Sequence, residues 1–205
     1  MTLSSVDALW LRSLQQLTAF ISHDLKGALN GASVNLEVVR ARSARETSTG
    51  ADVHKFAASA ADQLGVVIRV SGALLSLGRA PRGPAEVSIV TKQLSALLDD
   101  MKTAAGGKFE VQVEGGMSAE TAAPLNAVRL AIAESLLAAS SGTGPVSVRV
   151  RWLPTPLVRI SPATGPSLPS EVQSALLSVG IRIDMDGHGI SIAFPGPAEL
   201  PTEDA

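Results

Sequence analysis

Apolar and polar side chains alternate with the period of an α-helix from about Leu3 to Arg45. At about 100° per residue, the apolar side chains fall within about 60° of one line along this helix. These residues are Leu14, Leu17, Ile21, Leu25, Ala28, Ala32, Leu36 and Val39. A second helical pattern follows the polar turn Thr47–Ala51, with Asp52 as candidate N-cap, and ends at the Gly- and Pro-rich segment 78–84. These spacings predict a long helical hairpin.

A lone hairpin of this length cannot bury all of its apolar surface, because each helix packs against one neighbour only. Pairing two hairpins into a four-helix bundle solves this problem with the fewest new elements. We therefore expect a homodimer.

After residue 84 the pattern changes to short strands that alternate with helices. Asp186–Gly187 lies between two alternating segments and supplies the turn of a hairpin. The predicted elements are strand 86–90, helix 91–105, strand 108–113, helix 122–140, strands 146–152 and 157–160, helix 169–179, and strands 181–185 and 190–194. We expect an α/β sandwich with one sheet covered by helices on one face, and therefore an α+β chain.

The composition narrows the possible functions. The net charge of -2 provides no field that would recruit nucleic acid or an anionic membrane, and no apolar run approaches the length of about 20 residues that spans a bilayer. Cysteine is absent, which excludes disulfides and thiolate metal sites. We expect a cytoplasmic protein with no nucleic-acid or membrane partner.

One histidine stands out from the helical pattern. His23 lies about 180° from the apolar line of the first helix, so its imidazole is expected in solvent. No second ligand lies beside it at the spacing of a metal site, and no metal is expected there. His54 and His188 are interpreted as a surface residue and a turn residue. His23 is therefore the candidate for contact with another macromolecule.

The segment Phe20–Asn30, FISHDLKGALN, resembles the phosphoacceptor box of sensor histidine kinases, Ser-His-Glu/Asp-Leu-Arg/Lys-x-Pro-Leu. The second helix and the order of the later elements are similar to the rest of that family's dimerisation and ATP-binding domains. The resemblance implies that His23 is the phosphoacceptor and that Asp24 assists proton removal from it. Lys26, one turn further on, would steady the phosphoryl group. Gly27 stands where bifunctional members carry Thr or Asn, which argues against phosphatase activity.

The second half departs from the family at the positions that bind nucleotide. The helix that should carry the asparagines reads AIAESLLAAS at Ala131–Ser140, and no asparagine follows Asn126. The place of the Asp-x-Gly-x-Gly box holds Ile160–Pro166, which contains no carboxylate, and Leu168–Gly180 is too short for the family's lid. We expect no nucleotide cofactor, with Mg²⁺ supplied only by a partner.

The sequence thus predicts a histidine phosphotransferase that resembles a degenerate sensor histidine kinase. His23 would accept a phosphoryl group from the aspartate of one response-regulator receiver domain and pass it to another. Ser22, Gly27 and Asn30 are the predicted partner contacts. The alternatives are a non-catalytic dimeric adaptor and a divergent ATP-dependent kinase. The predicted parts are a hairpin domain, 1–82, a degenerate ATPase-like sandwich, 83–196, and a frayed tail, 197–205.

Overall fold

The computed structural model describes residues 5–45, 49–78, 83–104, 107–114, 119–142, 144–152, 154–163 and 165–197. It is an α+β chain that divides into two compact units. A helical unit comprises Gln15–Gly78, and an α/β unit comprises Met1–Leu14 with Arg79–Ala205. The predicted tail lies outside the described residues apart from Pro197.

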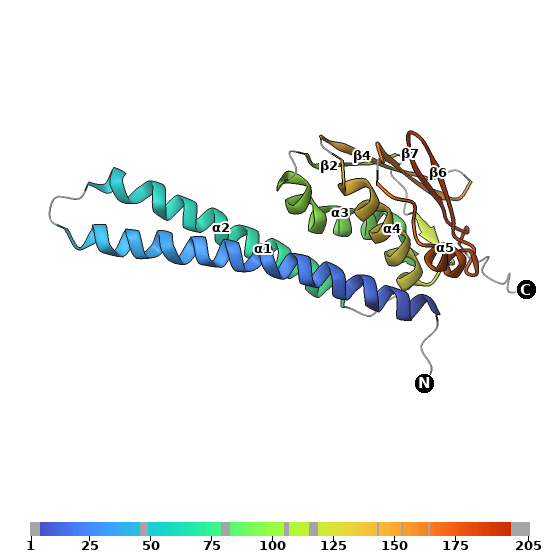
Figure 1. Cartoon of the computed structure of the whole chain (residues 1–205), viewed down its shortest axis with the longest axis horizontal. Helices are drawn as coiled ribbons and strands as arrows, with labels where there is room; N and C mark the ends of the chain where they lie inside the picture. Colours follow the sequence, from blue (N-terminus) through green and yellow to red (C-terminus); the bar gives the residue numbers. More distant parts are fainter. Residues whose placement is uncertain are drawn as a thin grey trace, which may run out of the picture. The chain divides into compact units, whose positions relative to one another are not determined.

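The helical unit consists of two long helices, α1 (Ser5–Ser43) and α2 (Gly50–Leu77). Figure 1 shows them as an antiparallel hairpin. The fully buried apolar residues of this unit include Leu17, Ile21 and Ala32 on α1, as the helical pattern predicts. Leu36 belongs to the predicted line but is 50% exposed. Because α2 begins at Gly50, Asp52 lies inside the helix and is not its N-cap.

Hydrogen bonds between polar side chains join the two helices near the middle of the hairpin. The amide Nδ2 of Asn35 donates hydrogen bonds to Ser59 Oγ at 3.1 Å and to Gln63 Oε1 at 3.2 Å. A Cβ at Gly31 would overlap the end of the Gln63 side chain, which passes close to α1 at this position. These contacts fix the register of the hairpin.

The α/β unit is built on a five-stranded sheet with the order β2-β4-β5-β7-β6. Only β2 and β4 pair in parallel, and the other neighbours are antiparallel. The strands are β2 (Phe109–Val113), β4 (Val146–Trp152), β5 (Pro156–Ser161), β6 (Arg182–Asp186) and β7 (Gly189–Ala193). A second, small sheet pairs β1 (Ala85–Glu86) with β3 (Glu120–Thr121).

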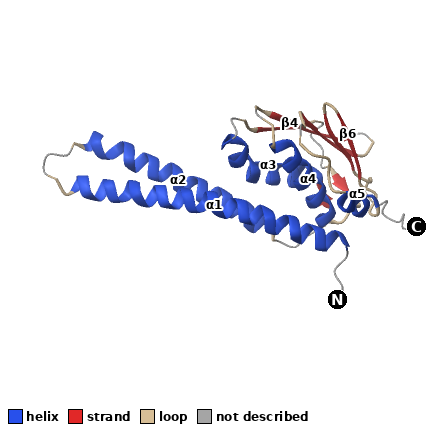
Figure 2. Ribbon diagram, in the orientation of Figure 1, coloured by secondary structure: helices blue, strands red, loops and turns tan. Residues whose placement is uncertain are grey.

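Helices cover one face of the large sheet, as the sequence predicts. They are α3 (Val87–Ala104), α4 (Leu125–Ser140) and α5 (Ser170–Leu177). Figure 2 shows these helices on the same side of the strands. The strands alternate accordingly, with Val148, Val158 and Ile192 fully buried and their sequence neighbours more exposed. The core of this unit lies between the sheet and α3 and α4.

The predicted strand at 86–90 is wrong. Only Ala85 and Glu86 form a strand, and α3 begins at Val87. Val87, Val90 and Leu94 are buried at helical spacing, so burial on one face of a helix outweighs the β-propensity of the local Val and Ile residues. The terminal hairpin is confirmed, but its two-residue turn is Gly187–His188, because Asp186 pairs with Gly189.

The sequence predicts a hairpin domain that spans residues 1–82. In the structure, however, the N-terminal turns of α1 belong to the α/β unit. Val6 and Trp10 are only 4% and 5% exposed. The amide Nδ2 of Asn126 on α4 donates to Asp7 Oδ1 at 2.9 Å. The sandwich therefore includes about three turns of helix from the other end of the sequence.

Candidate functional site

His23 stands in solvent, as the helical phase predicts. Its side chain is 91% exposed on α1, within the helical unit. The other two histidines of the sequence are also exposed, His54 near the start of α2 and His188 in the turn between β6 and β7. Exposure alone does not distinguish the three histidines. The residues around His23 are therefore the evidence that makes it the candidate site.

The carboxylate of Asp24 lies beside one nitrogen of the His23 ring. Nδ1 is 3.3 Å from Asp24 Oδ1, and the Asp24 side chain is 51% exposed. A carboxylate accepts hydrogen bonds only, so this contact favours the tautomer with the proton on Nδ1. Nε2 then carries the lone pair and faces solvent. The geometry therefore presents Nε2 as the nucleophilic nitrogen.

The other predicted site residues differ in how they are placed around His23. Lys26 and Asn30 are exposed and lie within about 60° and 20° of His23 around the helix axis. Ser22 is only partly exposed, and its hydroxyl donates to the carbonyl of Thr18 at 2.7 Å. That intrahelical bond makes Ser22 the weakest of the predicted partner contacts.

Gly27 leaves an open place on the same face. A Cβ at this position would have no heavy atom within 4 Å. Phe20 and Val34 flank it along the helix, are 55% and 60% exposed, and lie within about 60° of His23. These two residues were not among the predicted partner contacts, although the helical phase that places His23 also places them. The imidazole therefore stands on a face with apolar side chains at both ends and a bare glycine between them.

In the histidine-kinase family that the sequence resembles, the helix at the place of α4 binds nucleotide. In this protein, α4 is almost entirely buried. Along α4, Ala131, Ile132, Ala133 and Leu136 have no exposed surface. The loop that follows β5 packs directly on this helix, because a Cβ at Gly165 would overlap the carbonyl of Ala138. The segment at the place of the missing carboxylate box therefore packs closely on α4 through its backbone at Gly165.

The remaining polar side of α4 is covered by the first turns of α1. Ser13 Oγ hydrogen-bonds to the carboxylate of Glu134, and Ser13 is only 3% exposed. The guanidinium of Arg129 lies 5.9 Å from the centroid of the Trp10 ring. Burial lowers the pKa of Arg129 below its usual value. Asn126, Arg129 and Glu134, three polar side chains of α4, therefore all contact the first turns of α1.

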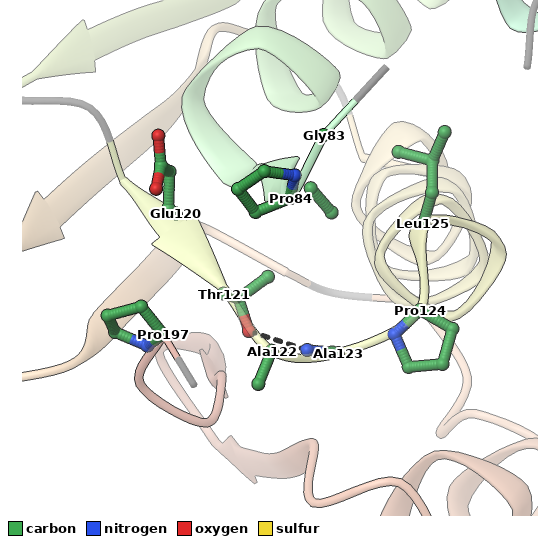
Figure 3. Close-up of a pocket in the computed structure, with 10 residues that line it drawn as sticks. Gly83, Pro84, Glu120, Thr121, Ala122, Ala123, Pro124, Leu125 and Pro197 are labelled. Atoms are coloured by element: carbon green, nitrogen blue, oxygen red, sulfur yellow. Dashed lines mark hydrogen bonds between the residues drawn. The ribbon is translucent and has the colours of Figure 1, made fainter. Parts of the chain in front are cut away.

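A separate cavity lies elsewhere in the α/β unit. It has a volume of about 830 Å³ and is lined by residues of three segments, Gly83–Ala85, Glu120–Leu125 and Pro197 (Figure 3). Thr121 Oγ1 donates to the carbonyl of Pro195 at 2.7 Å and accepts from the amide of Ala123 at 3.1 Å, so its hydroxyl is satisfied. Among the described residues of this lining, one is charged, the acid Glu120, which disfavours a phosphate ligand.

Metal-ligand groups and membrane-spanning helices also bear on the class of protein. Within the described residues, no group of three His, Asp or Glu side chains could hold a metal ion. The segment Val53–Leu77 of α2 is long and apolar enough, by length and composition, to cross a membrane, contrary to the expectation from the sequence. Core helices of soluble proteins meet the same criterion.

Comparison with solved structures finds proteins described as histidine kinases. The histidine kinase AdeS of Acinetobacter baumannii is 9% identical, with a TM-score of 0.46 over 84% of this chain and 97% of its own. The cytoplasmic segment of the histidine kinase QseC is 14% identical, with a TM-score of 0.44 over 65% and 92%. The histidine kinase ThkA, solved in complex with the response regulator TrrA, is 14% identical, with a TM-score of 0.39 over 90% and 61%.

These likenesses concern the fold and assign no activity to this chain. No family model and no curated protein matches the sequence.

Proposed function

We propose that the protein is a cytoplasmic histidine phosphotransferase that carries a phosphoryl group on His23 between receiver domains. The observation that carries this proposal is the contrast between two helices. On α1, His23 is 91% exposed beside a carboxylate. On α4, the positions that would bind nucleotide are buried or bonded within the chain. The phosphoryl group is therefore expected from another protein.

The transfer needs one nucleophile and one proton holder. Nε2 of His23 attacks the phosphorus of an aspartyl phosphate, the P–N bond forms, and the P–O bond breaks with its electron pair on the aspartate carboxylate. The proton on Nδ1 stays in place, and Asp24 stabilises the positive charge that develops on the ring. Lys26 supplies a nearby positive charge for the phosphoryl oxygens. Transfer to a second receiver runs through the same steps in reverse, and the receiver supplies Mg²⁺.

The receiver would dock on the face of α1 that carries His23. Phe20 and Val34 offer apolar contacts on either side of the open position at Gly27. Asn30 adds a polar contact within about 20° of His23. A small contact of this kind suits the short lifetime of a signalling complex.

A homodimer accounts for the apolar surface that the hairpin leaves open. On α2, Leu64, Ile68 and Leu75 are 39%, 73% and 70% exposed and lie within about 40° of one another around the axis. On α1, Leu29 and Leu36 are 47% and 50% exposed. Burying these stripes against a second hairpin gives a four-helix bundle. The same pairing explains why α2 is apolar enough to cross a membrane without placing it in one.

The test is phosphoryl transfer to the purified full chain. Incubation with a receiver domain phosphorylated by a small-molecule donor should label the protein with an acid-labile, base-stable phosphate. The label should be lost in His23→Ala and retained in His54→Ala, which removes another exposed histidine of the helical hairpin. ATP with Mg²⁺ but without a phosphorylated receiver should give no label.

Three outcomes would contradict the proposal. Labelling of His23→Ala would place the phosphate elsewhere. Labelling by ATP and Mg²⁺ alone would indicate a divergent kinase. Receiver binding that survives His23→Ala, with no transfer from any phosphorylated receiver tested, would indicate a non-catalytic adaptor.

A further inference from the structure

The large sheet of the α/β unit has an outer face that none of its helices covers. The helices α3, α4 and α5 lie on the opposite side (Figure 2). Alternate strand residues point outward, and on the two central strands, β4 and β5, they include Arg149, Arg151 and Arg159. An uncovered face usually carries mixed polar side chains, so three arginines at its centre need an explanation.

The acids of this face lie at its two edges. Glu110 and Glu114 stand on and just after the edge strand β2, and Asp184 and Asp186 stand on the opposite edge strand, β6. Each edge also carries one base, Lys108 in an ion pair with Glu110 at 3.2 Å and Arg182 on β6, so each edge holds two acids and one base. The middle holds three arginines. By net charge the outer face is therefore banded, negative, positive and negative from edge to edge.

Two of the central arginines are turned toward the edges. Arg151 Nε donates to Glu114 Oε2 at 2.8 Å. Arg159 donates from its two terminal nitrogens to Ser191 Oγ at 2.8 Å and to Asp186 Oδ2 at 2.9 Å. These bonds hold both guanidinium groups away from the middle of the face.

Arg149 remains at the centre with no ion pair or side-chain hydrogen bond to any residue that the structure describes. It pairs directly with Arg159 across β4 and β5. Like charges at directly opposed positions of an antiparallel pair are destabilising. Its outward neighbours Ser147 and Ser161 are small, so the guanidinium is accessible from above. A bound anionic group at Arg149 would remove the repulsion.

We propose that this banded face docks a partner protein through a narrow acidic ridge, such as one line of Glu or Asp side chains along a helix. The carboxylates of the ridge would meet Arg149, with Arg159 beside it, and basic groups flanking the ridge would meet the acids on β2 and β6. A polyanion such as nucleic acid or an anionic membrane fits poorly, because those same edge acids would repel it. The inference does not depend on phosphate transfer at His23.

The test is a titration of the isotope-labelled full chain followed by backbone amide shifts. The probe is a synthetic helical peptide with glutamates on one line and lysines on both flanks. A peptide of the same composition in scrambled order, a short DNA duplex and phosphatidylserine vesicles serve as comparisons. The ridge peptide should shift amides of β4 and β5, and Arg149→Glu should weaken its binding by about tenfold or more. Arg69→Glu, an equal charge change on α2, should leave binding within about twofold.

A second measurement separates docking from a structural role. Arg149→Gln should unfold at the same temperature as the wild type or higher, because the substitution removes a like-charge pair. A clear fall in unfolding temperature would assign Arg149 to the fold and overturn the proposal. Equal binding of the scrambled peptide, the duplex or the vesicles would overturn it too, as would no binding of the ridge peptide. Self-association through this face, abolished by Arg149→Glu, would replace the partner with a second copy.

Discussion

At the scale of single residues, Gly165 shows how closely the loop after β5 packs on α4. A methyl group at this position would overlap the carbonyl of Ala138 on α4. We therefore expect Gly165→Ala to lower the free energy of unfolding by about 1–3 kcal/mol, as overpacked sites do. Urea unfolding followed by circular dichroism would measure the change.

The matched control is a glycine with open surroundings. Gly27→Ala places a methyl group where no heavy atom lies within 4 Å, inside an exposed stretch of helix. This substitution should raise the free energy of unfolding by up to about 1 kcal/mol, because alanine favours helix. Equal effects of the two substitutions would show that the loop after β5 does not press on α4.

Asp186 contributes to the way in which the stability of the protein depends on pH under acidic conditions. The hydrogen bond from Arg159 lowers the pKa of this carboxyl below its usual 3.8, and the amide of His188 adds to the effect at 2.9 Å. Because the pKa in the folded state is the lower one, the stabilisation is present above about pH 4 and is lost as pH falls through the folded value. Asp186→Asn should therefore lower the unfolding temperature at pH 6, and the difference should shrink toward pH 3. A difference that stays constant with pH would contradict this origin.

The helical phase of α1 was sufficient to predict the exposure of His23, because an isolated helix face can be derived from spacing alone. The 3.3 Å contact of Nδ1 with Asp24 was not derivable, since it depends on a rotamer. Phe20 and Val34 follow from the same phase, but apolar side chains on a helix usually pack inside the protein, so the pattern alone does not mark them as partner contacts.

At the scale of elements, the first turns of α1 complete the sandwich. Trp10 is 5% exposed and lies under the guanidinium of Arg129. Trp10→Ala should lower the free energy of unfolding of the α/β unit by about 3–5 kcal/mol, as large-to-small core substitutions do. Hydrogen exchange in α4 should rise at the same time. Leu11→Ala, at the next position with 46% exposure, should change stability by less than about 1 kcal/mol. Similar effects of the two substitutions would mean that α1 does not cover α4.

This assignment could not come from the sequence, for a physical reason. Residues 5–14 continue the helical period of the hairpin without a break, so the local pattern places them with α2. Their partners Asn126 and Glu134 lie more than a hundred positions away, and no local propensity encodes such a contact. The strand predicted at 86–90 failed similarly, because buried helical spacing at Val87 and Val90 outweighed short-range β-propensity.

At the scale of the whole molecule, the open apolar stripe of the hairpin makes a prediction about assembly. Ile68 and Leu75 are 73% and 70% exposed, so a single hairpin gains little from them. Replacing both with glutamate should leave the helix content unchanged and weaken dimerisation at least about a hundredfold, because two carboxylates would be desolvated in the bundle.

Sedimentation velocity tests this prediction. Vesicle flotation tests the alternative, in which the apolar stripe binds a lipid surface. The wild type should sediment as a dimer and the double variant as a monomer, while neither floats with vesicles. Ile89→Glu, at a 47% exposed position on α3 in the other unit, should remain dimeric. A wild type that is monomeric at micromolar concentration would contradict the four-helix bundle. A wild type that floats until Ile68 and Leu75 are replaced would assign the stripe of α2 to a lipid surface. A stripe of exposed leucines and isoleucine favours burial against a partner. The charged residues Asp62 and Arg69 within the same helix favour a protein partner over lipid.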